Sequence, residues 1–160
     1  MPGLPSQLAA VMVPEPANIA AHWAASCHAR PPEVWREWEA GLAVALLPAG
    51  RSWDAVAMSY TAMQAVAQDQ QDPQLLDHAA ILADMKLDLC YLFVPVGAAS
   101  SWDVPGTTPL GESCWLVASQ PGRRRQQSAG TWVQEATLHD PLVDADRLRA
   151  ALLRTAEVHP

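Results

Sequence analysis

The chain has 160 residues, of which 50% are hydrophobic and 17% are charged, a composition typical of one globular domain. Ten basic and seventeen acidic residues give a net charge of −7, so nucleic acid and anionic lipid are not default partners. Cys27, Cys90 and Cys114 form no disulfide framework, and no stretch is long and apolar enough to cross a bilayer. We therefore expect a cytoplasmic protein with no membrane partner.

The first part of the chain is rich in proline and poor in large apolar side chains. Four of the first sixteen residues are proline, at positions 2, 5, 14 and 16. Such a segment lacks the apolar material for a core. We expect residues 1–30 to form a poorly ordered arm with one short helical piece around residues 18–26. Residues 31–160 should then form the folded domain.

Hydrophobic periodicity in the remaining chain predicts about three helices and five or six strands. Pro31 and Pro32 suit a helix start, and Ser59 and Asp144 are typical N-cap residues. The expected helices cover residues 31–41, 60–68 and the chain end after 144; the expected strands cover 42–47, 53–58, 81–84, 88–94, 113–118 and 131–135. A three-residue turn joins the third and fourth strands into a hairpin, and residues 97–111 form a long loop.

The order of these elements predicts the fold class. Strands follow one another in runs, with helices near the ends, and this arrangement indicates an α+β domain rather than an alternating α/β domain. We expect one mixed or antiparallel sheet. Trp38, Trp53 and Trp115 lie in strongly apolar patterns, so we expect all three to be mostly buried.

Two short stretches resemble each other, and each places a Trp–Asp pair beside a turn. The first is Gly50-Arg51-Ser52-Trp53-Asp54, and the second is Ser101-Trp102-Asp103. An indole face can stack on a ring, and an adjacent carboxylate can bind a hydroxyl group or a metal. Arg51, Trp53, Asp54, Trp102 and Asp103 are therefore candidate ligand-binding residues. The alternative is that each Trp packs in the core while its Asp accepts hydrogen bonds from nearby backbone.

The sequence predicts no catalytic residue, metal site or cofactor. Asp54, Asp84, Asp88 and Asp103 lack the close spacing of a paired-acid metal motif, and His22, Cys27 and His28 are too few for structural zinc. Glycine-rich phosphate loops and nucleophile motifs are absent from the sequence.

Arg123, Arg124 and Arg125 form the one local basic cluster. These three residues are candidate anion-binding residues, and the alternative is a solvated turn between two strands. On an acidic protein, three adjacent charges support only weak and salt-sensitive binding of nucleic acid.

Four segments carry a family resemblance, and they occur in a fixed order. They are Gly50-Arg51-Ser52-Trp53-Asp54-Ala55-Val56, Tyr91–Gly97, Leu110–Val117 and Gly130–Val133. This order resembles small actinobacterial proteins that are similar to the N-terminal domain of bifunctional DNA primase/polymerases. The resemblance covers roughly residues 42–152. It implies an α+β fold and nucleotidyl transfer that uses metal-binding acids and a histidine, with Asp54 at an acidic strand position.

The residues and the resemblance together leave three functions open. Because paired acids are not visible, we expect a non-catalytic binding or interaction module that is a degenerate relative of that domain. One alternative is a working metal-dependent nucleotidyltransferase. The other is an accessory protein that binds a protein partner, or a second copy of itself, without involving nucleic acid. Convergence of the aspartates in space would favour the enzyme, and dispersed aspartates would favour the module.

Overall fold

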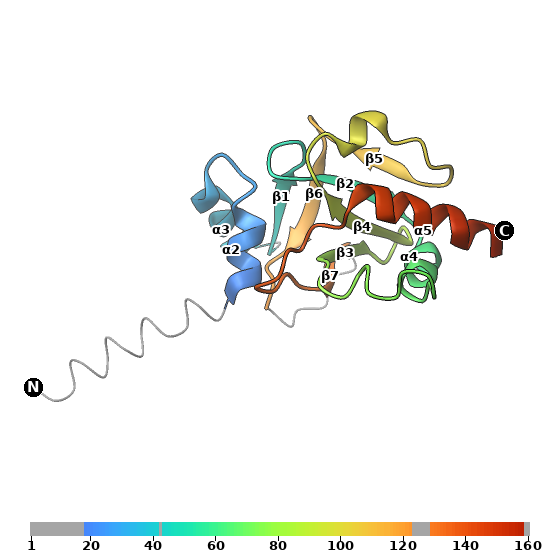
Figure 1. The fold of residues 1–160 in the computed structure, drawn as a ribbon. Helices are drawn as coiled ribbons and strands as arrows, with labels where there is room; N and C mark the ends of the chain where they lie inside the picture. The colour runs from blue at the N-terminus through green and yellow to red at the C-terminus, as the bar shows by residue number, and fades with distance from the viewer. Residues whose placement is uncertain (1–17, 42, 123–128, 159–160) are drawn as a thin grey trace, which may run out of the picture.

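The computed structural model describes residues 18–41, 43–122 and 129–158, which form helices and strands in the order shown in Figure 1. The helices are α2 (Ile19–Ala25), α3 (Pro31–Glu39), α4 (Tyr60–Ala67), the 3-10 turn η2 (Ala98–Ser101) and α5 (Ala145–Val158); the strands are β1 (Val44–Pro48), β2 (Asp54–Met58), β3 (Ile81–Asp84), β4 (Leu89–Val94), β5 (Thr108–Leu110), β6 (Trp115–Ser119) and β7 (Ala129–Gln134). The α+β class is confirmed.

A five-stranded antiparallel sheet forms the centre of the domain, with strand order β5-β2-β4-β3-β7. The expected hairpin is present, because β3 and β4 pair from Asp84↔Leu89 to Ile81↔Leu92. Both predicted N-caps are also confirmed. The Ser59 hydroxyl accepts a bond from the Ala62 N–H at 3.1 Å, and Asp144 accepts one from the Arg147 N–H at 2.9 Å.

Each face of the central sheet packs against its own hydrophobic core. Along β4, Leu92 and Val94 face the core formed with α4 and α5, while Phe93 faces the core formed with α2, α3, β1 and β6. This alternation follows from the two-residue period of a strand. Figure 1 accordingly shows α2 and α3 on one side of the strands and α4 and α5 on the other.

Strands β1 and β6 form a separate two-stranded antiparallel sheet, which corrects the expectation of a single sheet. Trp38 joins this sheet to α3, because its indole N–H donates to the Ala118 carbonyl at 3.0 Å. Trp38 and Trp53 are buried as expected, but Trp115 is 52% exposed. Leu116 and Ala118 face the core, so strand alternation turns Trp115 outward. The expected strand is present as β6, and Trp115 lies on its solvent-facing side.

The segment before α3 belongs to the folded domain, which corrects part of the expected arm. Ala20, Ala21, Ala24 and Cys27 are buried in the core beneath α2 and α3. These small side chains let α2 lie close to the sheet, and Trp23 of the same helix packs against Phe93 with ring centroids 5.2 Å apart. The rest of the expected arm, residues 1–17, lies outside the described residues.

The expected long loop at residues 97–111 contains both η2 and β5, so the number of strands among the described residues rises to seven. Strand β5 has only three residues, and its middle residue is Pro109. It lies at the sheet edge and pairs with β2 from Ala55↔Leu110 to Ala57↔Thr108. A short edge strand containing proline has almost no sequence signal, which explains why the sequence did not predict it. Leu42, expected to begin the first strand, lies outside the described residues.

Candidate functional site

The two Trp–Asp pairs contact the same turn, η2, one at its start and the other at its end. Asp54 begins β2, and its Oδ2 accepts hydrogen bonds from the backbone N–H groups of Gly97 and Ala99, both at 2.9 Å. Trp102 is the residue that ends the turn. Gly97 has a φ of +98°, a conformation that favours glycine. The sequence pattern therefore marks the anchors of one loop, although its two halves lie 49 positions apart in the chain.

Asp54 also lines a cavity of about 360 Å³ between η2, the β1–β2 turn and the end of β5. The residue is only 3% exposed, and none of the described residues donates a hydrogen bond to its Oδ1. Val96, Ala99 and Pro109 give the cavity an apolar wall, and the exposed Glu112 also lines it.

Two glycines shape this cavity. A Cβ on Gly111 would lie 3.8 Å from each carboxylate oxygen of Asp54 and 3.2 Å from the Cβ of Ala99, so the glycine leaves space in front of the carboxylate. Gly50 has a φ of +90°, and a Cβ there would lie 2.6 Å from the backbone of Glu112. Only glycine fits that position without displacing the backbone.

Trp53 is too deeply buried to stack on a ligand, whereas Trp102 lines a cavity beside α5. Trp53 is 1% exposed and packs edge-on against Phe93, with ring centroids 4.6 Å apart. Trp102 is partly buried against the core beneath α5. Its indole N–H donates to the Thr107 hydroxyl at 2.8 Å, and that hydroxyl donates to the Val104 carbonyl. Both rings therefore contribute to packing.

Asp103 lies at a second, smaller cavity of about 230 Å³ beside α5. Its Oδ1 accepts a hydrogen bond from the Arg149 Nε at 3.0 Å, and the Nη2 of the same guanidinium forms an ion pair with it at 2.9 Å. The two cavities lie on different parts of η2, since Ala98 lines the Asp103 cavity and Ala99 lines the Asp54 cavity.

Arg51 lies on the exposed turn between β1 and β2. Burial raises the pKa of the nearby Cys27 thiol to about 12, and a backbone hydrogen bond and the positive charge of Arg51 only partly oppose this effect. Cys27 is therefore an uncharged core residue at neutral pH and not an activated nucleophile.

The remaining candidate acids lie at the far end of the sheet. Asp54 pairs with Val94, whereas Asp84 pairs with Leu89. Five residues of strand separate those positions, which is about 17 Å at 3.3 Å per residue. Asp84 accepts bonds from the Lys86 and Leu87 N–H groups within its own turn. Within the described ranges, no three His, Cys, Asp or Glu side chains are placed to hold a metal ion.

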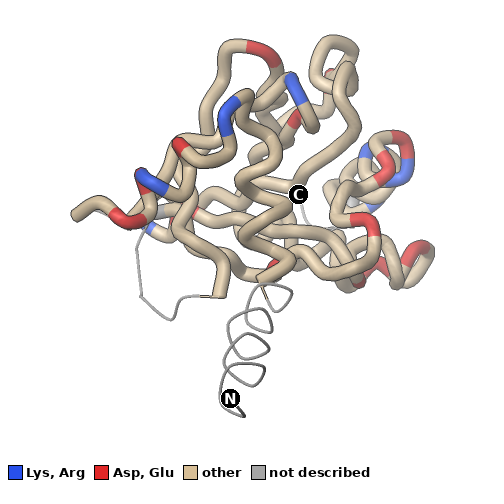
Figure 2. Tube along the Cα trace, turned by 90° about the vertical axis from the view of Figure 1, so that its left-hand side faces the viewer, with Lys and Arg blue, Asp and Glu red and all other residues tan. Residues whose placement is uncertain are grey.

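The arginines of α5 are paired with carboxylates. Arg147 binds Asp72 through two hydrogen bonds of 2.9 and 2.6 Å, and Arg154 binds Asp69. In Figure 2, acidic and basic residues of the described chain alternate along the backbone trace and do not separate into regions of one charge. The candidate anion-binding residues Arg123, Arg124 and Arg125 lie outside the described residues.

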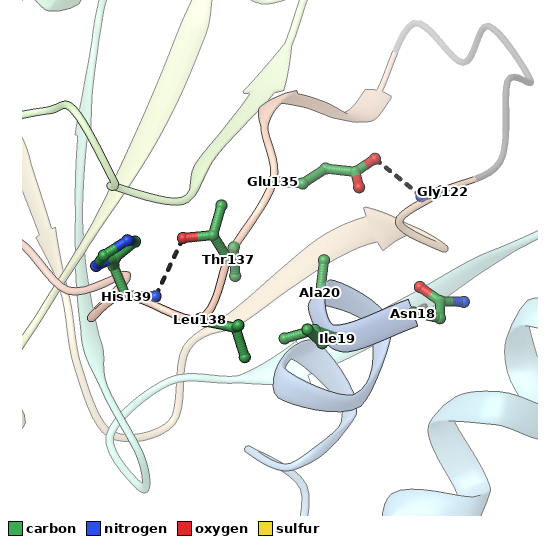
Figure 3. Close-up of a pocket in the computed structure, with 9 residues that line it drawn as sticks. Asn18, Ile19, Ala20, Gly122, Glu135, Thr137, Leu138 and His139 are labelled. Atoms are coloured by element: carbon green, nitrogen blue, oxygen red, sulfur yellow. Dashed lines mark hydrogen bonds between the residues drawn. The ribbon is translucent and has the colours of Figure 1, made fainter. Parts of the chain in front are cut away.

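A larger cavity of about 620 Å³ lies between the start of α2 and the segment after β7 (Figure 3). Its polar side chains already make local bonds: Asn18 accepts from the Ala21 N–H, Glu135 from the Gly122 N–H, and Thr137 from the His139 N–H. The His139 ring also stacks on His78, with centroids 4.0 Å apart.

No family model, curated protein or solved structure matches this chain. No helix in the described part of the chain has the length and apolar character needed to cross a membrane. Sequence reasoning identified Asp54 as a candidate but missed Gly97, Ala99 and Gly111, which surround its carboxylate. Gly97 and Gly111 bound the expected loop, and a glycine at each end was the available signal.

Proposed function

We propose that this protein is a non-catalytic binding module and a degenerate relative of the primase/polymerase N-terminal domain. The observation that carries the proposal is the dispersal of its aspartates. Asp54 holds η2, Asp84 holds its own turn and Asp103 pairs with Arg149. Two-metal phosphoryl transfer needs carboxylates that converge on ions about 4 Å apart, and these aspartates have separate partners.

The charge distribution supports the same proposal. Template binding requires basic groups that neutralise successive phosphates. Arg147, Arg149 and Arg154 of α5 are instead each engaged by an aspartate. A nucleic acid would have to compete with these ion pairs, in a protein whose net charge is −7.

The Asp54 cavity is the part of this module best suited to bind a ligand. A carboxylate removed from water is stabilised by hydrogen-bond donors. The two backbone donors found here both reach Oδ2. The other oxygen is thus suited to meet a donor supplied from outside the described chain.

The proposal is tested by primer extension with the full-length protein, a primed DNA template, nucleotides and Mg²⁺ or Mn²⁺. We expect no template-dependent incorporation. Incorporation by the wild type that disappears in Asp54→Asn or Asp103→Asn would overturn the proposal in favour of a metal-dependent nucleotidyltransferase. A circular dichroism spectrum of each variant confirms that the fold is retained.

A further inference from the structure

We propose that the Asp54 cavity binds a cationic nitrogen head group, an alkylammonium or alkylguanidinium, with Asp54 Oδ1 as its acceptor. This inference rests on the binding-module function proposed above and names the ligand class of that site. It follows from three features of the cavity, which are the position of the buried carboxylate, the glycine beside it and the apolar wall.

The carboxylate of Asp54 is fixed before any ligand arrives. Oδ2 is held by the Gly97 and Ala99 amides at 2.9 Å, and β2 pairs with β4 on one side and β5 on the other. A ligand therefore meets an immobilised acceptor and loses little affinity to side-chain ordering. Because the residue is only 3% exposed, a charge-assisted hydrogen bond to Oδ1 is stronger than one in open water.

The space in front of the carboxylate exists because residue 111 is a glycine. A single methyl group there would lie 3.8 Å from both Asp54 oxygens and would crowd Ala99 at 3.2 Å. Gly111 thus makes room for a nitrogen donor next to the acceptor.

The remaining walls fit an aliphatic stem with a cationic end. Val96, Ala99 and Pro109 supply apolar contact for methylene groups. Glu112 lines the same cavity and adds a second negative charge. An alkyl chain that ends in a cation can satisfy both features, whereas an anionic or purely apolar ligand would oppose one of them.

An organic cation suits this arrangement better than a divalent metal ion. Calcium takes six to eight oxygen ligands and magnesium requires octahedral geometry. The described residues offer no group of three metal-binding side chains. One carboxylate oxygen that receives no hydrogen bond from the described residues, with a second carboxylate lining the same cavity, is sufficient for an N–H donor.

The test is an NMR titration of the ¹⁵N-labelled full chain with methylguanidinium chloride, with N-methylurea as the neutral planar control. We expect saturable shifts of the Gly97, Ala99 and Gly111 amides at millimolar methylguanidinium and none with N-methylurea. Tetramethylammonium, a cation without N–H donors, controls for ionic strength.

Four variants assign the effect to the site. Asp54→Asn keeps an oxygen for the Gly97 and Ala99 amides but removes the charge, and it should weaken binding at least about tenfold. Gly111→Ala blocks access while leaving the carboxylate intact, and it should also weaken binding. Glu112→Gln should have a smaller effect. Asp103→Asn, in the neighbouring cavity, should have none.

The source of the head group is identified by comparing agmatine with an acetylated, amidated arginine peptide. Tighter binding of agmatine indicates a free small molecule, and tighter binding of the peptide indicates a side chain of a protein partner; either result supports the cation site. Shifts that fail to saturate, that persist in both Asp54→Asn and Gly111→Ala, or that are displaced by equimolar Ca²⁺ or Mg²⁺ would overturn it. A failure of cation binding would leave the primer-extension result unchanged, because the expected lack of nucleotide incorporation does not depend on the cation site.

Discussion

The N–H of Gly97 donates a 2.9 Å hydrogen bond to Oδ2 of Asp54, a residue 43 positions earlier in the chain. The Ala99 N–H donates to the same atom. One aspartate thus ties the start of η2 to strand β2 and shapes the wall of the Asp54 cavity. The next residue along the loop, Ser100, reinforces the turn by donating its hydroxyl hydrogen to the Gly97 carbonyl at 2.8 Å.

Removing the Asp54 acceptor should destabilise the protein. Asp54→Ala leaves the amides of Gly97 and Ala99 without their partner, so we expect a loss of about 1–3 kcal/mol in the free energy of unfolding. Urea denaturation measures this loss, and hydrogen exchange of the two amides should accelerate. Asp54→Asn should lose less stability. Equal losses in both variants would show that the charge, and not the oxygen acceptor, stabilises η2.

Gly50 should tolerate no side chain. Its φ is +90°, and a Cβ at this position would lie 2.6 Å from the Glu112 backbone. Gly50→Ala should therefore lower the free energy of unfolding by about 1–3 kcal/mol. Gly41→Ala is the matched control, because a Cβ there meets nothing within 4 Å. Thermal unfolding of both variants checks this prediction, and similar melting temperatures for the two would contradict it.

The two tryptophans Trp38 and Trp115 should differ sharply when truncated. Trp38 is fully buried and hydrogen-bonded to the Ala118 carbonyl. Trp38→Ala should therefore lower the free energy of unfolding by about 3–5 kcal/mol. Trp115 is 52% exposed, and Trp115→Ala should cost less than about 1 kcal/mol. Urea midpoints at an unchanged m-value test the difference. A large loss of stability in Trp115→Ala would contradict this prediction and would mean that another surface covers the Trp115 side chain in solution.

The ion pairs of α5 predict how stability changes in acid. The hydrogen bond from Arg147 is the main cause that lowers the pKa of Asp72, and that from Arg154 lowers the pKa of Asp69. A carboxyl group with a lowered folded-state pKa contributes stability above its unfolded value, and that stability is lost as the pH falls through the folded value. Below about pH 4 the wild type should therefore lose stability.

The matched variant for this effect is Asp69→Asn/Asp72→Asn. It lacks both titrating groups, so it should start less stable at neutral pH and should lose less stability on acidification. Melting temperatures between pH 7 and pH 3 measure the two slopes. Parallel curves for the wild type and the double variant would contradict the role of these pairs.

Much of the fold could be predicted because local patterns specify it. Ser59 and Asp144 cap their helices, and the turn at residues 85–88 closes the hairpin, all through bonds or pairing between near neighbours. The side of β6 that faces water could not be predicted in this way. Trp115, Leu116, Val117 and Ala118 are all apolar, so their pattern does not distinguish the two faces, and pairing with β1 and contact with the core decide the outcome.

The candidate site was predictable only in part for a similar reason. The Trp–Asp repetition drew attention to Asp54 and Trp102, and both do anchor the same turn. Their distance along the chain concealed that shared role. The partners of Asp54 are backbone amides, which carry no residue-type signal, and the importance of Gly111 is visible only when the Asp54 carboxylate is placed beside it.

The proposed function rests on aspartates that have separate partners and form no metal centre. The most direct test of this arrangement is paramagnetic broadening of the ¹⁵N spectrum by Mn²⁺ at concentrations well below that of the protein. A centre for metal-dependent nucleotidyl transfer at Asp54 would selectively broaden the nearby amides of Gly97, Ala99 and Gly111. We predict weak broadening spread over exposed acidic residues, with no preference for these three amides. Selective loss of their signals in the wild type, restored in Asp54→Asn, would contradict the non-catalytic module.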